Sequence, residues 1–269
     1  MAAITSLGST WTTTAGSKTV TAVPAVDDLI VVVAASSGLA GGTTSVSDDQ
    51  GGTFTQVDSD RTGFSTTGVL TVWVRDSLVA SSVSTVYTAA QVGSSGGGLS
   101  VLAVSGMLAV GAAAVRSNGG QSTGGAGTTP APVLNQTPLF SNPIITAVAN
   151  GTNGGGTTAR GGYADVAIAG YNTPATGLDL CSVEFGETTA TITWGGTSAT
   201  AFASVAIELD APPPVYAWIR STTDPVPALL RRRSRYRLAP PILPEEVPPV
   251  PPDLSGENLA PVIYGYGAM

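Results

Sequence analysis

The sequence predicts an all-β protein, an antiparallel β-sandwich of jelly-roll-like type, that continues into an extended, proline-rich C-terminal arm. Short runs rich in Val, Ile, Thr and aromatic residues alternate with Gly, Ser, Asp and Asn clusters in residues 1–210, a spacing typical of antiparallel sandwiches. No long helical periodicity appears there. Thirteen of the 19 prolines follow Asp210. We therefore expect a β-sandwich domain at 1–210 and a Pro/Arg-rich arm at 211–269.

Eleven runs in the first 210 residues have the composition of β-strands. Leu29–Val33 is apolar at every position, which indicates a central strand covered on both faces. In the last run Ala203, Val205, Ile207 and Leu209 form one apolar face, which predicts a half-buried strand. The expected strands are Thr19–Val23, Leu29–Ala35, Thr53–Val57, Val69–Arg75, Val83–Thr88, Leu99–Val104, Ile144–Ala149, Tyr163–Ala169, Leu178–Val183, Thr189–Trp194 and Ala201–Leu209.

Three weakly charged stretches must be assigned as strand, loop or membrane-spanning helix. Leu99–Val115 is interrupted by serine and glycine and is shorter than the ~20 apolar residues of a membrane helix, so we expect two buried strands joined near Gly106 and no membrane partner. Ser117–Thr129 and Gly151–Thr158 are rich in Gly, Ser and Thr. We expect loops there, either disordered or packed against neighbouring copies, and favour packing. The sequence before Lys18 does not have the features of a secretory signal.

The composition excludes most of the known types of catalytic and metal-binding site. The chain has no histidine and one cysteine, Cys181, so a Ser-His-Asp triad, a Cys-His pair, a histidine-ligated zinc and an internal disulfide are all excluded. We therefore expect a protein that is not an enzyme and that holds no metal and no cofactor. A glycosidase that uses two carboxylates stays open, because the sequence does not give the distance between them.

The charge is divided unevenly along the chain. The net charge is −7, which argues against nucleic acid as a partner. Residues 1–210 carry thirteen acidic and five basic side chains, whereas 211–269 carry six arginines and five acidic side chains. The body is therefore acidic and the arm is nearly neutral.

Pairs of neighbouring carboxylates are the remaining candidates for chemistry in the body. In the Asp48–Gly52 segment we expect the aspartates to accept hydrogen bonds from local backbone groups in a turn. Asp58-Ser59-Asp60 is a weak calcium candidate that lacks the EF-hand pattern. The four pairs are Asp27/Asp28, Asp48/Asp49, Asp58/Asp60 and Glu184/Glu187.

Two further sequence patterns indicate a structural role and not a catalytic or sugar-binding one. Gly93–Gly97 matches the Gly-x-Ser-x-Gly elbow, but without a histidine base or a strand-to-helix turn we reject it. Trp73 and Trp194 lie within strand patterns, so we expect them in the core and not stacked on a sugar ring.

The arm carries the predicted partner-binding residues. Five arginines surround Ser234 and Tyr236, and guanidinium groups bind carboxylates or phosphates in pairs of hydrogen bonds. We favour docking to an acidic protein surface over a solvated charge run or a nucleic-acid contact. Near the C-terminus, four apolar or aromatic residues could add a strand to a neighbour's sheet edge. The predicted residues are Arg231, Arg232, Arg233, Arg235, Tyr236, Arg237, Val262, Ile263, Tyr264 and Tyr266.

Four strings in residues 18–210 carry a family resemblance: Asp27–Ala35, Asp48–Thr55, Leu70–Arg75 and Ile192–Leu209. Their style and order resemble β-sandwich structural proteins of tailed-bacteriophage virions, which include capsid decoration proteins, minor capsid proteins and minor tail proteins. The resemblance carries over no catalytic residue.

The resemblance implies a structural component of a bacteriophage virion. We expect a capsid decoration or minor capsid protein that is located in the virion, attached to the shell through its C-terminal arm, and bound to the major capsid protein or other virion subunits. Its oligomeric form would be a homo-oligomer or a lattice-bound multimer. The alternative is a carbohydrate-binding or adhesin module of a tail fibre or cell surface.

Overall fold

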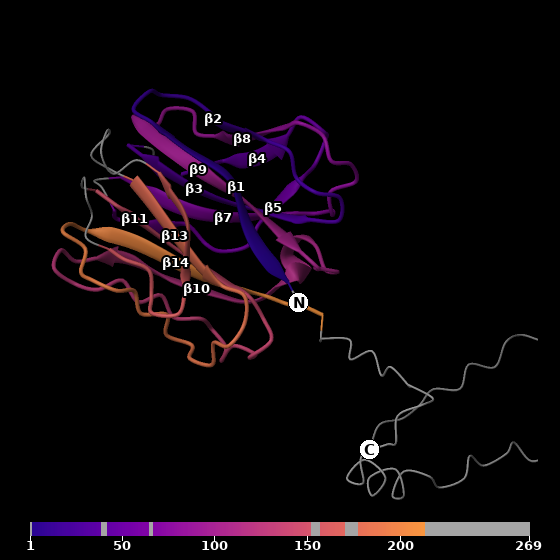
Figure 1. Cartoon of the computed structure of the whole chain (residues 1–269). Coiled ribbons are helices and arrows are strands. Elements are labelled where there is room, and N and C mark those ends of the chain that lie inside the picture. The colour runs from indigo at the N-terminus through magenta and orange to yellow at the C-terminus, as the bar shows by residue number, and fades with distance from the viewer. Residues whose placement is uncertain (1, 39–41, 65–66, 152–156, 170–176, 213–269) are drawn as a thin grey trace, which may run out of the picture. The chain divides into compact units, whose positions relative to one another are not determined.

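A computed structural model of the chain describes residues 2–38, 42–64, 67–151, 157–169 and 177–212 (Figure 1). In these residues the protein is all-β, and every pair of neighbouring strands is antiparallel. A 3-10 turn at Gly111–Ala114 (η1) precedes strand β10. The predicted all-β, antiparallel class is confirmed, and the arrangement is consistent with a β-sandwich.

The described strands form three sheets. The six-stranded sheet has the order β1 (Ala3–Thr12), β9 (Gly96–Ser105), β3 (Leu29–Ser37), β7 (Val69–Arg75), β5 (Phe54–Gln56), and β6 (Arg61–Thr62) also pairs with β7. The five-stranded sheet has the order β10 (Val115–Gly124), β14 (Phe202–Leu209), β11 (Ile144–Asn150), β13 (Gly177–Val183), β12 (Ala164–Ala169). The three-stranded sheet has the order β2 (Lys18–Ala22), β8 (Thr85–Ala90), β4 (Ser45–Asp48).

The six-stranded sheet lies between the other two, and its central strands β3, β7 and β9 are buried on both faces. Along β3, Val31 and Val33 contact the cluster shared with the five-stranded sheet, whereas Ile30 and Val32 contact the cluster shared with the three-stranded sheet. Successive side chains of a strand point to opposite faces, so an uninterrupted apolar run suits this position. The prediction that Leu29–Val33 is a central strand covered on both faces is confirmed.

The outer face of the five-stranded sheet is covered by chain that forms no regular strand. Leu134 and Ile192 pack on it at one end and Trp194 at the other. As a result β14 is buried along its whole length. The prediction of a half-buried strand is therefore wrong for this segment, although its apolar face was identified correctly and lies in the main core.

Ten of the eleven expected strands coincide with observed strands to within a few residues; Thr189–Trp194 does not. This segment lies antiparallel to Pro130–Leu134, with backbone hydrogen bonds of 2.9 Å from Ile192 N to the Pro132 oxygen and from Trp194 N to the Pro130 oxygen. Proline has no N–H to return such bonds. The pairing is therefore limited to an isolated bridge, Val133 with Thr191.

The expectation of a loop at Ser117–Thr129 is wrong, because Val115–Gly124 is strand β10. Its glycines are there for close packing: a Cβ on Gly119 would overlap the Val133 carbonyl, and one on Gly124 would overlap the Phe202 ring. A strand is predicted from the pattern of its side chains, and glycine has none. The absence of a side chain at these glycines is also what allows neighbouring segments of the chain to approach closely.

The prediction of two buried strands within Leu99–Val115 is confirmed for the first strand only. Its first part is the buried strand β9, but after Gly106 the chain forms the 3-10 turn η1 and not a second strand. Among the described residues no helix is long and apolar enough to span a membrane. The jelly-roll-like connectivity and the boundary at residue 210 stay predictions; β14 ends at Leu209.

Leu102→Ala tests the main core. Leu102 is fully buried in β9, so removing its side chain should lower the free energy of unfolding by about 2–5 kcal/mol. Leu108→Ala is the matched control, because Leu108 is 78% exposed and should change stability by less than about 0.5 kcal/mol. Chemical denaturation measures both, and equal effects would contradict the assigned core.

Candidate functional site

The predicted partner-binding residues, from Arg231 to Tyr266, all lie outside the described residues. The structure therefore brings none of them together and tests none of them. The structure defines the body within residues 2–212. The candidate sites below are surfaces of that body.

All basic side chains of the described body are engaged within it. Lys18 Nζ donates to the carbonyl oxygens of Thr14 at 2.6 Å and Gly16 at 2.7 Å. Each arginine forms an ion pair with a carboxylate: Arg61 with Asp58 at 2.6 Å, Arg75 with Asp48 at 2.9 Å, Arg116 with Glu208 at 2.6 Å and Arg160 with Glu187 at 3.2 Å. The carboxylates left over give the body an anionic surface, which favours cationic partners.

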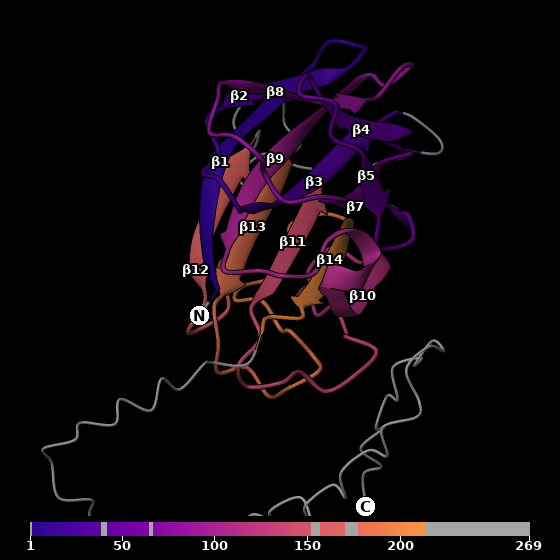
Figure 2. The same ribbon diagram turned by 90° about the vertical axis from the view of Figure 1, so that its right-hand side faces the viewer.

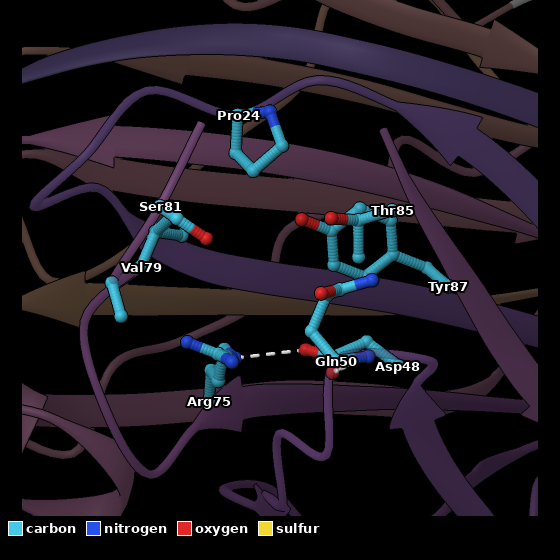
Figure 3. Close-up of a pocket in the computed structure, with 9 residues that line it drawn as sticks. Pro24, Asp48, Gln50, Arg75, Val79, Ser81, Thr85 and Tyr87 are labelled. Carbon is cyan, nitrogen blue, oxygen red and sulfur yellow. Dashed lines mark hydrogen bonds and ion pairs between the residues drawn. The ribbon is translucent and has the colours of Figure 1, made fainter. Parts of the chain in front are cut away.

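One polar pocket lies where β4, β7 and β8 meet, and it encloses about 110 Å³ (Figure 3). Asp48 organises its floor: Oδ1 accepts hydrogen bonds from the backbone N–H of Gln50 at 3.0 Å and of Gly52 at 2.7 Å, and Oδ2 accepts one from Arg75 Nε at 2.9 Å. The predicted turn chemistry of this segment is confirmed. The sequence pattern did not indicate Arg75 as the partner of Asp48.

Gly52 lets the guanidinium of Arg75 lie against the turn. A Cβ at this position would overlap both Asp48 Oδ2 and Arg75 Nε. Arg75 Nη1 also donates to the Leu78 carbonyl at 2.9 Å. The arginine is therefore held from two sides, by the Asp48–Gly52 turn and by the neighbouring carbonyls of Ser77 and Leu78, before any ligand arrives.

Tyr87 contributes a buried phenol to the same pocket. Its side chain is 1% exposed, and burial, followed by the negative charge of Asp48, raises the pKa of Tyr87 to about 12. The phenol therefore stays a neutral hydrogen-bond donor at physiological pH. Since both oxygens of Asp48 are occupied, the pocket is suited to hydrogen bonding with a small polar group and less suited to proton transfer.

A wider groove of about 570 Å³ lies between β1 and the β12–β13 edge of the five-stranded sheet. Figure 2 shows β1 and β12 side by side along this edge. The residues that line it include Ile4, Thr5 and Ser6 of β1 and Glu184 and Phe185, which follow β13. The sequence did not reveal this groove, because its walls come from two sheets.

A buried carboxylate, Asp179, lies one strand in from Asp165 on the outer face of the five-stranded sheet. It is 4% exposed, and its Oδ1 has no hydrogen-bond partner. Burial, followed by the negative charge of Asp165, raises the pKa of Asp179 to about 7. A carboxyl buried in this way is destabilised when it ionises.

The other sequence candidates have structural roles in the described part of the chain. Asp58 binds Arg61 through both oxygens, at 2.6 and 2.7 Å, so it is already occupied by a cation. No group of three or more His, Cys, Asp or Glu residues gathers at a point where it could hold a metal ion. Trp73 and Trp194 are buried, as predicted. Burial raises the pKa of the Cys181 thiol to about 12, which leaves it unreactive.

Comparison with known proteins gives no relative: no protein family, no curated protein and no solved structure matches this chain.

Asp179→Asn tests the buried carboxyl. The native pKa is raised, so the native state holds this proton up to pH about 7, whereas the unfolded chain releases it near pH 4. The contribution of this carboxyl to the stability of the wild type should therefore fall as pH rises from 4 to 7, by at most about 4 kcal/mol. The asparagine variant should lose this part of the pH dependence.

Urea denaturation across that pH range measures the difference. Asp60→Asn is the matched control, because Asp60 is an exposed aspartate whose carboxylate accepts one hydrogen bond from Gln56, and it should keep the wild-type profile. An Asp179→Asn profile that overlays the wild type would contradict the assignment.

Proposed function

We propose that this chain is a structural, non-catalytic component of a bacteriophage virion, a capsid decoration or minor capsid protein attached through its C-terminal arm. The body would be a jelly-roll-like sandwich of residues 1–210, and residues 211–269 would bind the major capsid protein or other virion subunits. The basis for the virion is the resemblance of four strings in the body to virion β-sandwich proteins.

The uneven distribution of basic residues between the body and the arm supports the proposal that the arm binds the partner. The described body uses all four of its arginines in internal ion pairs, whereas six of the chain's eleven basic residues lie after Asp210. An acidic neighbour would therefore be bound by the arm and not by the body. Five arginines within Arg231–Arg237 match carboxylates well, because each guanidinium can form paired hydrogen bonds.

Many copies on one particle would strengthen weak contacts. If each arm binds a regular array of subunits, the second and later contacts form at high effective concentration. The prolines of the arm limit the conformational entropy that is lost on docking. These considerations support a homo-oligomer or a lattice-bound multimer located in the virion.

Deletion of residues 211–269 tests the arm. The truncated chain should still fold, because β14, the last described strand, ends at Leu209, but it should no longer join the particle. The full and truncated chains are each produced with the other particle proteins, the particles are banded on a density gradient, and the bound chain is quantified by immunoblot.

Circular dichroism of the truncated chain is the folding control. Equal amounts of both chains in the particle band would contradict the role of the arm. A full chain that is absent from the band would overturn the virion assignment itself.

A carbohydrate-binding module is the second candidate, and the pocket at Arg75 is the observation that favours it. A preorganised guanidinium, a neutral phenol and the Gln50 amide line one small cavity, and such groups can bind sugar hydroxyls. The buried rings of Trp73 and Trp194 cannot serve as stacking platforms. Recognition would therefore depend on hydrogen bonds in this pocket.

Gln50→Ala tests the second candidate. A glycan array should show binding by the wild type and a loss of about tenfold in the variant, because one hydrogen bond to a ligand is worth about 1.4 kcal/mol. Gln56→Ala is the control, because Gln56 lies in β5 and does not line the pocket. An empty array for the wild type would exclude the candidate.

A further inference from the structure

We infer that residues 157–163 form a cover over the outer face of the five-stranded sheet, and that ionisation of the buried Asp179 beneath this cover opens it and exposes Cys181. The cover lies wholly within the described residues. The inference concerns the body alone and is independent of the proposed role in a virion.

Asp179 occupies a position on β13 where a negative charge is poorly compensated. It is 4% exposed, and its Oδ1 has no hydrogen-bond partner. Its Oδ2 accepts a hydrogen bond from Thr157 Oγ1 of the cover over 3.5 Å, and the Leu180 backbone also hydrogen-bonds the carboxyl. A buried carboxylate with an unpaired oxygen is strongly destabilised, whereas the neutral acid is tolerated.

Neighbouring strands supply no positive charge to Asp179. Asp165 of β12 pairs with Cys181, so it lies on the same face two residues along from Asp179 and adds a second negative charge. Asn150 of β11 lies on this face one row in the other direction, and neither polar atom of its side chain has a hydrogen-bond partner. Ionisation of Asp179 therefore brings two carboxylates close together without a balancing cation.

The cover is bonded to the neighbouring residues 187–195. Arg160 forms an ion pair with Glu187 at 3.2 Å, and Tyr163 donates to the same carboxylate at 3.1 Å, so neither group is free to bond the buried carboxyl. Thr158 and Gly195 exchange two backbone hydrogen bonds of 3.0 Å. The cover can therefore separate from the sheet without breaking a hydrogen bond between strands, and local openings of this kind cost less than global unfolding.

Cys181 lies beneath the cover and can report its opening. It is 0% exposed and packs in one cluster with Ala159 and Tyr163 of the cover, and the Arg160 backbone hydrogen-bonds to it. It is the only cysteine of the chain. Burial raises the pKa of Cys181 to about 12 and also raises the pKa of Tyr163, so neither group titrates below pH 8 while the cover is closed.

Protonation of Asp179 should keep the cover closed. Burial, followed by the negative charge of Asp165, raises the pKa of Asp179 to about 7 in the closed form, whereas an aspartate in water has a pKa near 4. Opening therefore releases a proton in this range. The open population should rise about tenfold per pH unit as pH rises toward 7, and it should level off above pH 7.

Labelling of Cys181 with a pyridyl disulfide reagent under native conditions tests the inference. The labelling rate follows the open population multiplied by the reactivity of the exposed thiol. The rate of the wild type is divided by that of Asp179→Asn, because this variant cannot ionise here and the pH dependence of the thiol cancels. The ratio should rise about tenfold per unit between pH 5 and 7 and stay level from pH 7 to 8.

Two further variants make the test specific to this carboxyl. Asp60→Asn is the matched control, because Asp60 is an exposed aspartate, and it should keep the wild-type rates. Asp165→Asn removes the neighbouring negative charge, so its rates should level off at a lower pH than those of the wild type. This shift gives a second readout if circular dichroism shows that Asp179→Asn does not fold.

Urea separates opening of the cover from global unfolding. Opening of the cover exposes little surface, so about 1 M urea should leave the labelling rate nearly unchanged. A rate ratio that stays constant from pH 5 to 8 would overturn the role of Asp179. A labelling rate that rises with urea as steeply as global unfolding does, or a wild type that is not labelled at any pH, would overturn the cover.

Discussion

The structure depends on one constraint, which is that the central strands of the six-stranded sheet are removed from water on both faces. Its inner strands β3, β7 and β9 present apolar side chains to two separate clusters, so the other two sheets must each cover one face. Thr71 of β7 is a buried polar group that is paired: its Oγ1 donates to the Ala34 carbonyl and accepts a hydrogen bond from the Trp73 indole at 3.1 Å. Unpaired, such groups would cost about 1–3 kcal/mol each.

The same constraint explains which parts of the fold could be predicted. A strand buried on both faces is apolar at every position, so Leu29–Val33 was recognisable from composition alone. Strand β10 was not, because Gly119 and Gly124 serve the close approach of other chain segments. At the Asp48 turn the local hydrogen bonds were predictable, whereas the Arg75 partner, 27 residues away, depends on how β4 and β7 are brought together.

Burial of acidic groups determines how the body uses its few cations. Asp48 and Glu208 have side-chain exposures of 1% and 0%, and a buried carboxylate without a partner is strongly unfavourable. Glu208 also accepts hydrogen bonds from Leu139 N at 2.9 Å and Asn142 Nδ2 at 2.8 Å. Because the arginines of the described body are engaged by Asp48, Asp58, Glu187 and Glu208, the exposed acids Asp165 and Glu184 form no ion pair with them.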